Sequence, residues 1–188
     1  MLRLTLAGMD TLVTSPLCAR CPSGPAGCCA APPSLAWADL GRIVARGGTA
    51  WVRAELAAGR LRPCPRGLAI ARAPGPHGTA CTYLGATGCS LAPDRRSGTC
   101  NEYLCEDAYA DAERAADPLA ARARAAHAAL ERAFAAWDEA LAAAIAERGA
   151  PPAFDDDFFT WLGAAFERVR RARPVSRAAL ERRTGRDR

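Results

Sequence analysis

The nine cysteines are the residues of this chain whose spacing is best suited to chemistry. Cys18 and Cys21 have the CxxC spacing, in which a tight turn can direct two thiolates at one metal ion, at about 2.3 Å each for zinc. Backbone N–H groups in such a turn also stabilise the thiolate form that a metal requires. A thioredoxin-like redox motif is the alternative, but that motif opens a helix after a strand, whereas Cys21 is followed by Pro-Ser-Gly-Pro. The pair is therefore interpreted as half of a metal site.

Eight of the nine cysteines are expected to bind metal. Successive cysteines of the second group are separated by 7, 10 and 4 residues, so glycine- and proline-containing turns must return the chain repeatedly to one point. Two interpretations of the adjacent Cys28 and Cys29 stay open, because neighbouring side chains diverge: one binds metal while the other packs, or each reaches a different metal. Cys64 is interpreted as a small buried hydrophobic residue. The expected ligands are Cys18, Cys21, Cys28, Cys29, Cys81, Cys89, Cys100 and Cys105.

Thiolate ligands alone do not choose the metal. Tetrahedral sulfur sites suit zinc and iron–sulfur clusters alike, so the expected cofactor is zinc or iron, with an iron–sulfur cluster included. Eight thiolates could hold one cluster or two ions, and both arrangements stay open.

Composition narrows the classes of function. All 25 basic residues are arginine, which excludes Schiff-base chemistry and lysine-containing phosphate loops. No stretch reaches the roughly 20 apolar residues of a membrane span, and the N-terminus does not resemble a signal peptide, so we expect a cytoplasmic protein without a membrane contact. Cytosolic thiols are kept reduced, so we do not expect these cysteines to form disulfides. The basic tail lacks interleaved aromatic residues, so nucleic-acid binding is not expected.

The cysteines must be positioned by the first part of the chain, because all of them lie between residues 18 and 105. We expect residues 1–107 to form a small irregular cysteine-rich metal module with short helices. Apolar spacing predicts one helix after Ser34 and a second from Thr49 to Gly59, and only residues 68–70 suggest a strand.

Residues 108–188 are expected to form a helical extension that packs on the module and ends in the basic tail. An apolar stripe predicts a long helix from Asp117 to Gly149, and a second helix is expected over about 155–173. Ser176 can cap a last short helix. The expected fold class is therefore mainly α, with an antiparallel helical hairpin after the module.

The segment CARCPSGPAGCC followed by SLAWADLGRIVARG resembles the opening of the YkgJ-like cysteine-cluster family, a zinc- or iron-chelating CxxCxxCC domain. The segment from Cys81 to Cys105 resembles the second cysteine group of that family, with Leu84 and Arg95 in place. A longer gap before Cys28 and the residues Arg96 and Asn101 mark a divergent member. The resemblance implies chelation of zinc or iron, and a related segment in flagellin lysine N-methylases implies an iron–sulfur cluster.

Three functions are weighed, and whether the chain is an enzyme stays open. The first is a metal-binding protein. The second is an iron–sulfur-dependent enzyme or an accessory protein for modification. The third is an adaptor whose C-terminal helices bind a protein partner, with a structural metal. An enzyme would need polar groups near the cysteines, and those available are His77, Asp94, Glu102, Tyr103, Glu106 and Asp107, with His127 on the long helix.

Overall fold

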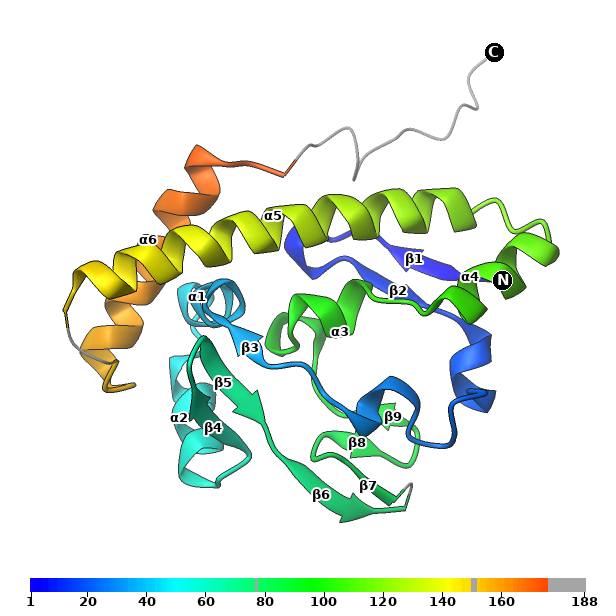
Figure 1. Cartoon of the computed structure of the whole chain (residues 1–188), viewed down its shortest axis with the longest axis horizontal. Coiled ribbons are helices and arrows are strands. Elements are labelled where there is room, and N and C mark those ends of the chain that lie inside the picture. The colour runs from blue at the N-terminus through cyan, green and yellow to red at the C-terminus, as the bar shows by residue number, and fades with distance from the viewer. Residues whose placement is uncertain (77, 150–151, 176–188) are drawn as a thin grey trace.

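The computed structural model describes residues 1–76, 78–149 and 152–175 (Figure 1). The helices are α1 (Trp37–Ala45), α2 (Thr49–Ala57), α3 (Gly98–Glu102), α4 (Glu106–Arg114), α5 (Ala120–Glu147) and α6 (Asp156–Ala172). The strands are β1 (Arg3–Thr5), β2 (Leu12–Thr14), β3 (Leu35–Ala36), β4 (Leu61–Cys64), β5 (Gly67–Ile70), β6 (Arg72–Gly75), β7 (Gly78–Cys81), β8 (Leu84–Gly85) and β9 (Gly88–Cys89). Short 3₁₀ turns are η1 (Gly8–Asp10), η2 (Pro16–Arg20), η3 (Gly27–Ala30) and η4 (Pro93–Arg95).

The expected fold class, mainly α with an irregular cysteine module, is wrong. The described part of the chain holds nine short strands in four antiparallel sheets, one of them three-stranded in the order β3-β5-β4. The reason is turn chemistry: two-residue loops, Pro65-Arg66 and Ala86-Thr87, close the β4–β5 and β8–β9 hairpins. Strands of two to four residues are too short to display the alternation of apolar and polar residues that would reveal them in the sequence.

The two long C-terminal helices are confirmed, although their packing is not that of a simple hairpin. The Asp155 side chain caps α6 by accepting a hydrogen bond from the backbone N–H of Phe158 at 2.8 Å. Figure 1 shows α5 along one side of the molecule and α6 crossing its far end, next to α1. A Cβ on Gly41 would lie 2.6 Å from Phe166, so glycine is what allows α1 to approach α6 this closely. The expected helical hairpin is thus corrected to a group of three helices, α1, α5 and α6. The helix expected after Ser176 lies outside the described residues.

The main hydrophobic core lies between these three helices and the β3-β5-β4 sheet. Trp137 of α5 is fully buried, its ring lies 5.7 Å from that of Phe166, and its indole N–H donates to the carbonyl of Arg173 at 2.8 Å. A second, smaller cluster joins the β1–β2 hairpin to α4 and the start of α5, around Tyr109. The apolar stripe of α5 is therefore used for packing inside the protein.

Among the described residues, no helix combines the length and the hydropathy needed to cross a lipid bilayer.

Candidate functional site

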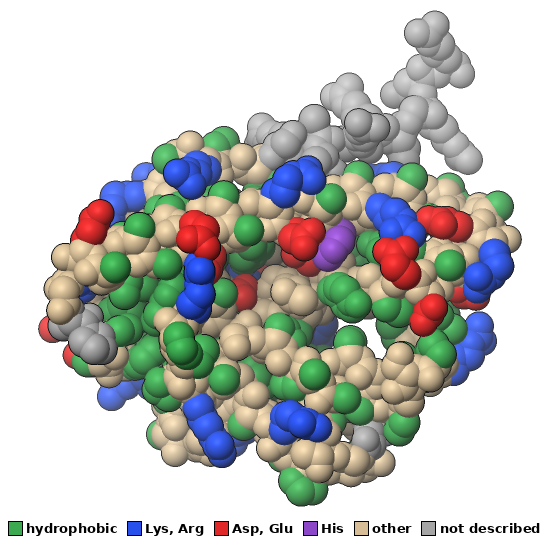
Figure 2. Space-filling view, in the orientation of Figure 1, with side chains coloured by type: hydrophobic (Ala, Val, Ile, Leu, Met, Phe, Trp, Pro, Cys, Tyr) green, Lys and Arg blue, Asp and Glu red, His purple; other side chains and the backbone are tan. Residues whose placement is uncertain are grey.

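A cavity of about 410 Å³ lies between η3, β7, the β8–β9 hairpin and α3. Figure 2 shows the surface hollowed in this part of the molecule, between the α3–α4 segment and the β8–β9 hairpin. A binding pocket for a small ligand typically measures about 300–1,000 Å³, so the cavity has room for more than a single ion. Five cysteines contribute to its wall: Cys28, Cys29, Cys81, Cys89 and Cys100. The remaining wall is mostly apolar, with Ile70, Leu84 and Leu91 among the lining residues.

The first wall of the cavity is η3, which carries Cys28 and Cys29. Gly27 opens η3 in the left-handed region, at φ +51°, and a Cβ there would lie 3.1 Å from the Cys21 Sγ. Glycine therefore lets η3 fold back against the CxxC segment. η3 also packs against β7, whose last residue is Cys81. Segments far apart in the sequence are brought together in this way.

The opposite wall is formed by the β8–β9 hairpin and α3. Cys89 lies opposite Leu84 in the hairpin. Cys100 lies in the first turn of α3, where its backbone N–H donates to the capping Ser97 Oγ at 3.1 Å. The buried Asp39 of α1 accepts a hydrogen bond from the Gly98 N–H at 2.7 Å, which attaches this wall to the helical core.

The other three expected ligands lie beyond η3. Cys18 lies on η2, Cys21 follows its last residue, and Cys105 immediately precedes α4, which packs against η2. Burial raises the pKa of Cys18, and the nearby charges of Cys28, Cys105 and Cys21 raise it further. Cys28, which lines the cavity, thus also acts electrostatically on the CxxC segment.

The thiols of the cavity influence each other's ionisation. A hydrogen bond from the Cys29 thiol lowers the pKa of Cys28 to about 6, and the same bond raises the pKa of Cys29. Burial is the main reason that the pKa of Cys100 is raised to about 11, and the charges of Cys89 and Cys81 add to the rise. Several thiolates at this place would therefore repel one another unless a cation compensated their charge.

The structure does not present a ready-made metal centre. All nine cysteines are free thiols. Within the described ranges, no three Cys, His, Asp or Glu side chains are placed to hold one metal ion together. The expected metal module is corrected accordingly: five of its eight expected ligands line a cavity, and the other three lie beyond η3. Cys64 is separate from them, because it pairs with Gly67 in the β4–β5 hairpin and does not line the cavity.

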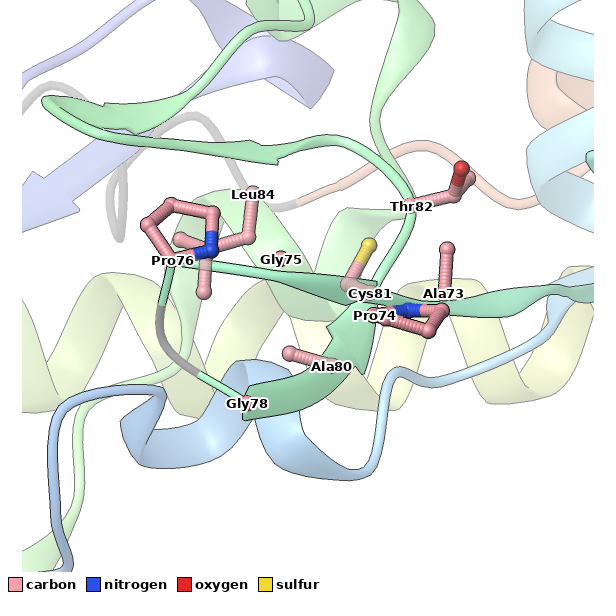
Figure 3. A pocket seen from close by; sticks show the side chains of 9 residues that line it. All are labelled: Ala73, Pro74, Gly75, Pro76, Gly78, Ala80, Cys81, Thr82 and Leu84. Atoms are coloured by element: carbon pink, nitrogen blue, oxygen red, sulfur yellow. The ribbon is translucent and has the colours of Figure 1, made fainter.

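A second cavity, of about 40 Å³, lies beside the β6–β7 hairpin (Figure 3). Its wall consists of small residues such as Ala73, Pro74 and Ala80, and it shares Cys81 and Leu84 with the larger cavity. It has room for only a few water molecules. Cys81 thus lies at the partition between the two spaces.

Two of the polar residues considered for an enzyme are engaged in ion pairs. Glu106 forms an ion pair with Arg124, and Asp94 forms one with Arg95, each at 2.9 Å. Asp107 is exposed. His77 lies outside the described residues.

Three of these polar residues lie close to the cavity. Tyr103 lines it, and its ring lies 6.2 Å from that of His127 in an edge-on arrangement. Glu102 is buried, and burial together with the charges of Asp39 and Glu131 raises its pKa to about 8. None of the three has the paired geometry of an acid–base site.

Sequence reasoning missed two buried polar groups that support the site. Arg42 is fully buried and donates to Asp10 Oδ1 at 2.5 Å and to the carbonyl of Arg96, a residue of the cavity wall. Tyr83, also in that wall, donates its hydroxyl to Glu55 at 2.6 Å. For Arg42 a signal existed, since a charged residue lies among the apolar residues of α1.

Comparisons with protein-family models, with curated proteins and with solved structures find no match to this chain.

Proposed function

We propose that this chain is a metal-binding cysteine-cluster protein that holds zinc or iron, an iron–sulfur cluster included, through cysteine thiolates. The observation that carries the proposal is the cavity of about 410 Å³ with five cysteines in its wall. The five cysteines come from four elements, η3, β7, β9 and α3, so it is the fold, and not their spacing in the sequence, that brings them together. The ligands proposed are the eight that the sequence predicts, Cys18, Cys21, Cys28, Cys29, Cys81, Cys89, Cys100 and Cys105.

The donor chemistry of the cavity fits a thiophilic metal. The described residues of its wall include five thiols and two tyrosines, Tyr83 and Tyr103, but no carboxylate and no imidazole. Soft thiolate donors select zinc, copper(I) or iron–sulfur clusters over magnesium and calcium, which need oxygen donors. Among these metals, the resemblance to the YkgJ-like family points to zinc or iron.

Binding requires the thiols to converge from the positions described. A cysteine side chain reorients by rotation about one bond, χ1. The segment before Cys28 turns at Gly24 and Gly27, which have positive φ values that glycine adopts without the steric cost of a Cβ. Cys28, whose pKa is lowered to about 6, provides a thiolate at neutral pH, and the other ligands release protons as the metal binds.

Metal content per chain, measured by elemental analysis on untagged protein purified without oxygen, tests the proposal. We expect a fixed amount of zinc, or of iron with acid-labile sulfide. The Cys89→Ser variant should lose metal, and Cys64→Ser, the matched control outside the cavity, should retain it. A folded, reduced protein that contains no metal and takes up neither zinc nor iron would refute the proposal.

A further inference from the structure

Cys28 and Cys29 are adjacent in the sequence, and both of their side chains line the large cavity. Side chains of neighbouring residues ordinarily diverge, but these two thiols share a hydrogen bond. The 3₁₀ turn fixes their backbone: the N–H of Cys29 donates to the carbonyl of Ala26 at 3.0 Å, and the N–H of Ala31 donates to the carbonyl of Cys28 at 3.3 Å. η3 therefore presents a contacting pair of thiols to the inside of the cavity.

The wall across from this pair is apolar and aromatic. Leu84 of the β8–β9 hairpin and Leu91, which follows it, both line the cavity. Tyr83 contributes its ring, because its hydroxyl donates to Glu55 at 2.6 Å. Tyr103 lines the cavity and is 44% exposed, which places it where the cavity meets solvent. The cavity thus combines two soft donor atoms on one side with an apolar surface on the other.

A trivalent organoarsenical matches both features. Its arsenic carries one organic group and two exchangeable oxygen ligands, so it requires two thiols, whereas a tetrahedral zinc ion requires four ligands. Within the described part of the chain, no three Cys, His, Asp or Glu side chains are placed to hold one ion, but the requirement for two thiols is met by Cys28 and Cys29. A cavity of about 410 Å³ has room for the organic group as well.

We propose that the cavity binds small trivalent organoarsenicals, with Cys28 and Cys29 bonded to arsenic and the organic group against the apolar wall. In water, the arsenic of such a compound carries two hydroxyl groups. Each As–O bond breaks as an As–S bond forms, and each thiol proton leaves with a hydroxyl group, so two water molecules are released. Arsenic stays trivalent, and no oxidant or reductant takes part. Arsenical binding goes beyond the proposed function and does not rest on it, because it uses two thiols and neither zinc nor iron.

The CxxC pair is the competing site within the chain. Cys18 and Cys21 also have a spacing that lets two thiols reach one atom. Neither of them lines the cavity, and Cys18 lies on η2 with its side chain exposed. The CxxC pair therefore offers the organic group no part of the apolar wall formed by Leu84 and Leu91.

The site is tested with phenylarsine oxide, added at one equivalent to the full-length chain after reduction and removal of metal by a chelator. Thiols that remain free are then alkylated, and peptide mass spectrometry identifies the protected ones. We expect Cys28 and Cys29 to be protected, and Cys18 and Cys21 to be alkylated. Protection of any other pair of thiols, or no binding at all, overturns the inference.

Cys29→Ser and Cys21→Ser form a matched pair of variants, since each removes one thiol from one of the two candidate sites. Cys29→Ser should weaken the binding of phenylarsine oxide by at least about 100-fold, because the second bond forms within one chain at a high effective concentration. Cys21→Ser should bind as tightly as the unchanged chain. The reverse order overturns the assignment. Circular dichroism shows whether each variant is folded, and the protection pattern of the unchanged chain decides the question if one is not.

Comparison with methylarsonous acid tests the role of the apolar wall. Both affinities are measured in competition with the same small dithiol, which removes the intrinsic difference between the two arsenicals. On this scale the chain should favour the phenyl compound by about tenfold, because its larger apolar surface is buried, and Leu84→Ala should reduce the preference. Equal affinities would overturn the placement of the organic group in the cavity. A chain that takes up neither zinc nor iron loses the proposed function but still gives a result here, so the two failures are distinguishable.

Discussion

Around Trp137 the chain is closely packed, whereas around Cys89 it encloses a space. Trp137 is fully buried among aromatic rings, and glycines at the facing helix positions bring α1 and α6 together. Cys89 is exposed, and η2, η3 and η4 contain no buried residue. The helical core is therefore stabilised by buried apolar surface, and the cysteine region has little of it. A metal bound here, as we propose, would add stability that the side chains of this region do not supply.

Metal removal is the largest perturbation that this comparison predicts. Chelation under reducing conditions should increase amide hydrogen exchange in residues 78–105 by at least about tenfold. In this region the bound metal, and not buried apolar surface, would supply the local stability. Exchange in α5 and α6 should change little. Hydrogen exchange read by mass spectrometry measures both regions in one sample. Equal loss of protection in both would show that the two regions are stabilised as one unit.

Trp137→Ala should have the next largest effect and should act on the helical core. Truncating a fully buried tryptophan costs about 3–5 kcal/mol of unfolding free energy, as removal of a large core side chain usually does. Leu91→Ala is the comparison variant, because Leu91 is half-buried and faces the existing cavity, and we expect it to cost about 1 kcal/mol. Denaturant unfolding measures both values. Similar costs would contradict the difference in packing.

Arg42→Ala tests the charged group that connects the core to the cavity wall. Its loss leaves Asp10 and Asp39 without their buried partner, and breaking such a pair costs about 3 kcal/mol. Arg53→Ala is the matched control, because its ion pair with Asp156 is exposed and contributes about 0–1 kcal/mol. Thermal and denaturant unfolding compare the two. If Arg53→Ala lost as much unfolding free energy as Arg42→Ala, burial would not explain the contribution of the Arg42 ion pairs to stability.

Gly27→Ala should have the smallest effect on stability and the most local one. Alanine at φ +51° costs about 1–2 kcal/mol, and its Cβ would press on the Cys21 Sγ. Gly47→Ala, at φ +75° with open space around it, carries the strain without the contact. We expect both variants to lose similar stability and only Gly27→Ala to bind zinc more weakly. Equal zinc affinity in a competition titration would show that Gly27 does not shape the site.

The helical part of the fold could be predicted from the sequence because its signals are local. Regular apolar spacing marked α5 and α6, and Asp155 marked the start of α6. The hairpins between residues 61 and 89 could not be predicted in this way, because strands of two to four residues are too short to show a repeating apolar pattern. The packing of α6 on α1 depended on Gly41, whose role is visible only once Phe166 lies opposite it.

The candidate site was predictable in type but not in arrangement. Cysteine spacing indicated which thiols to consider as ligands, and Cys64 could be distinguished from them. Which thiols meet depends on contacts between distant segments, such as η2 with α4, and on the buried Arg42 and Asp39. No local pattern encodes those contacts.

The attachment of α3 determines how the cavity can close. α3 is fixed to the helical core by the Asp39–Gly98 hydrogen bond and by Phe134, whose ring would lie 3.2 Å from a Cβ on Gly98. η3, on the other side, has no buried residue, and both Gly24, which precedes it, and Gly27, which opens it, have positive φ. One wall is thus anchored and the other is adjustable. Closing on the metal that we propose would therefore order the segment from Gly24 to Ala30 and leave the helices in their places.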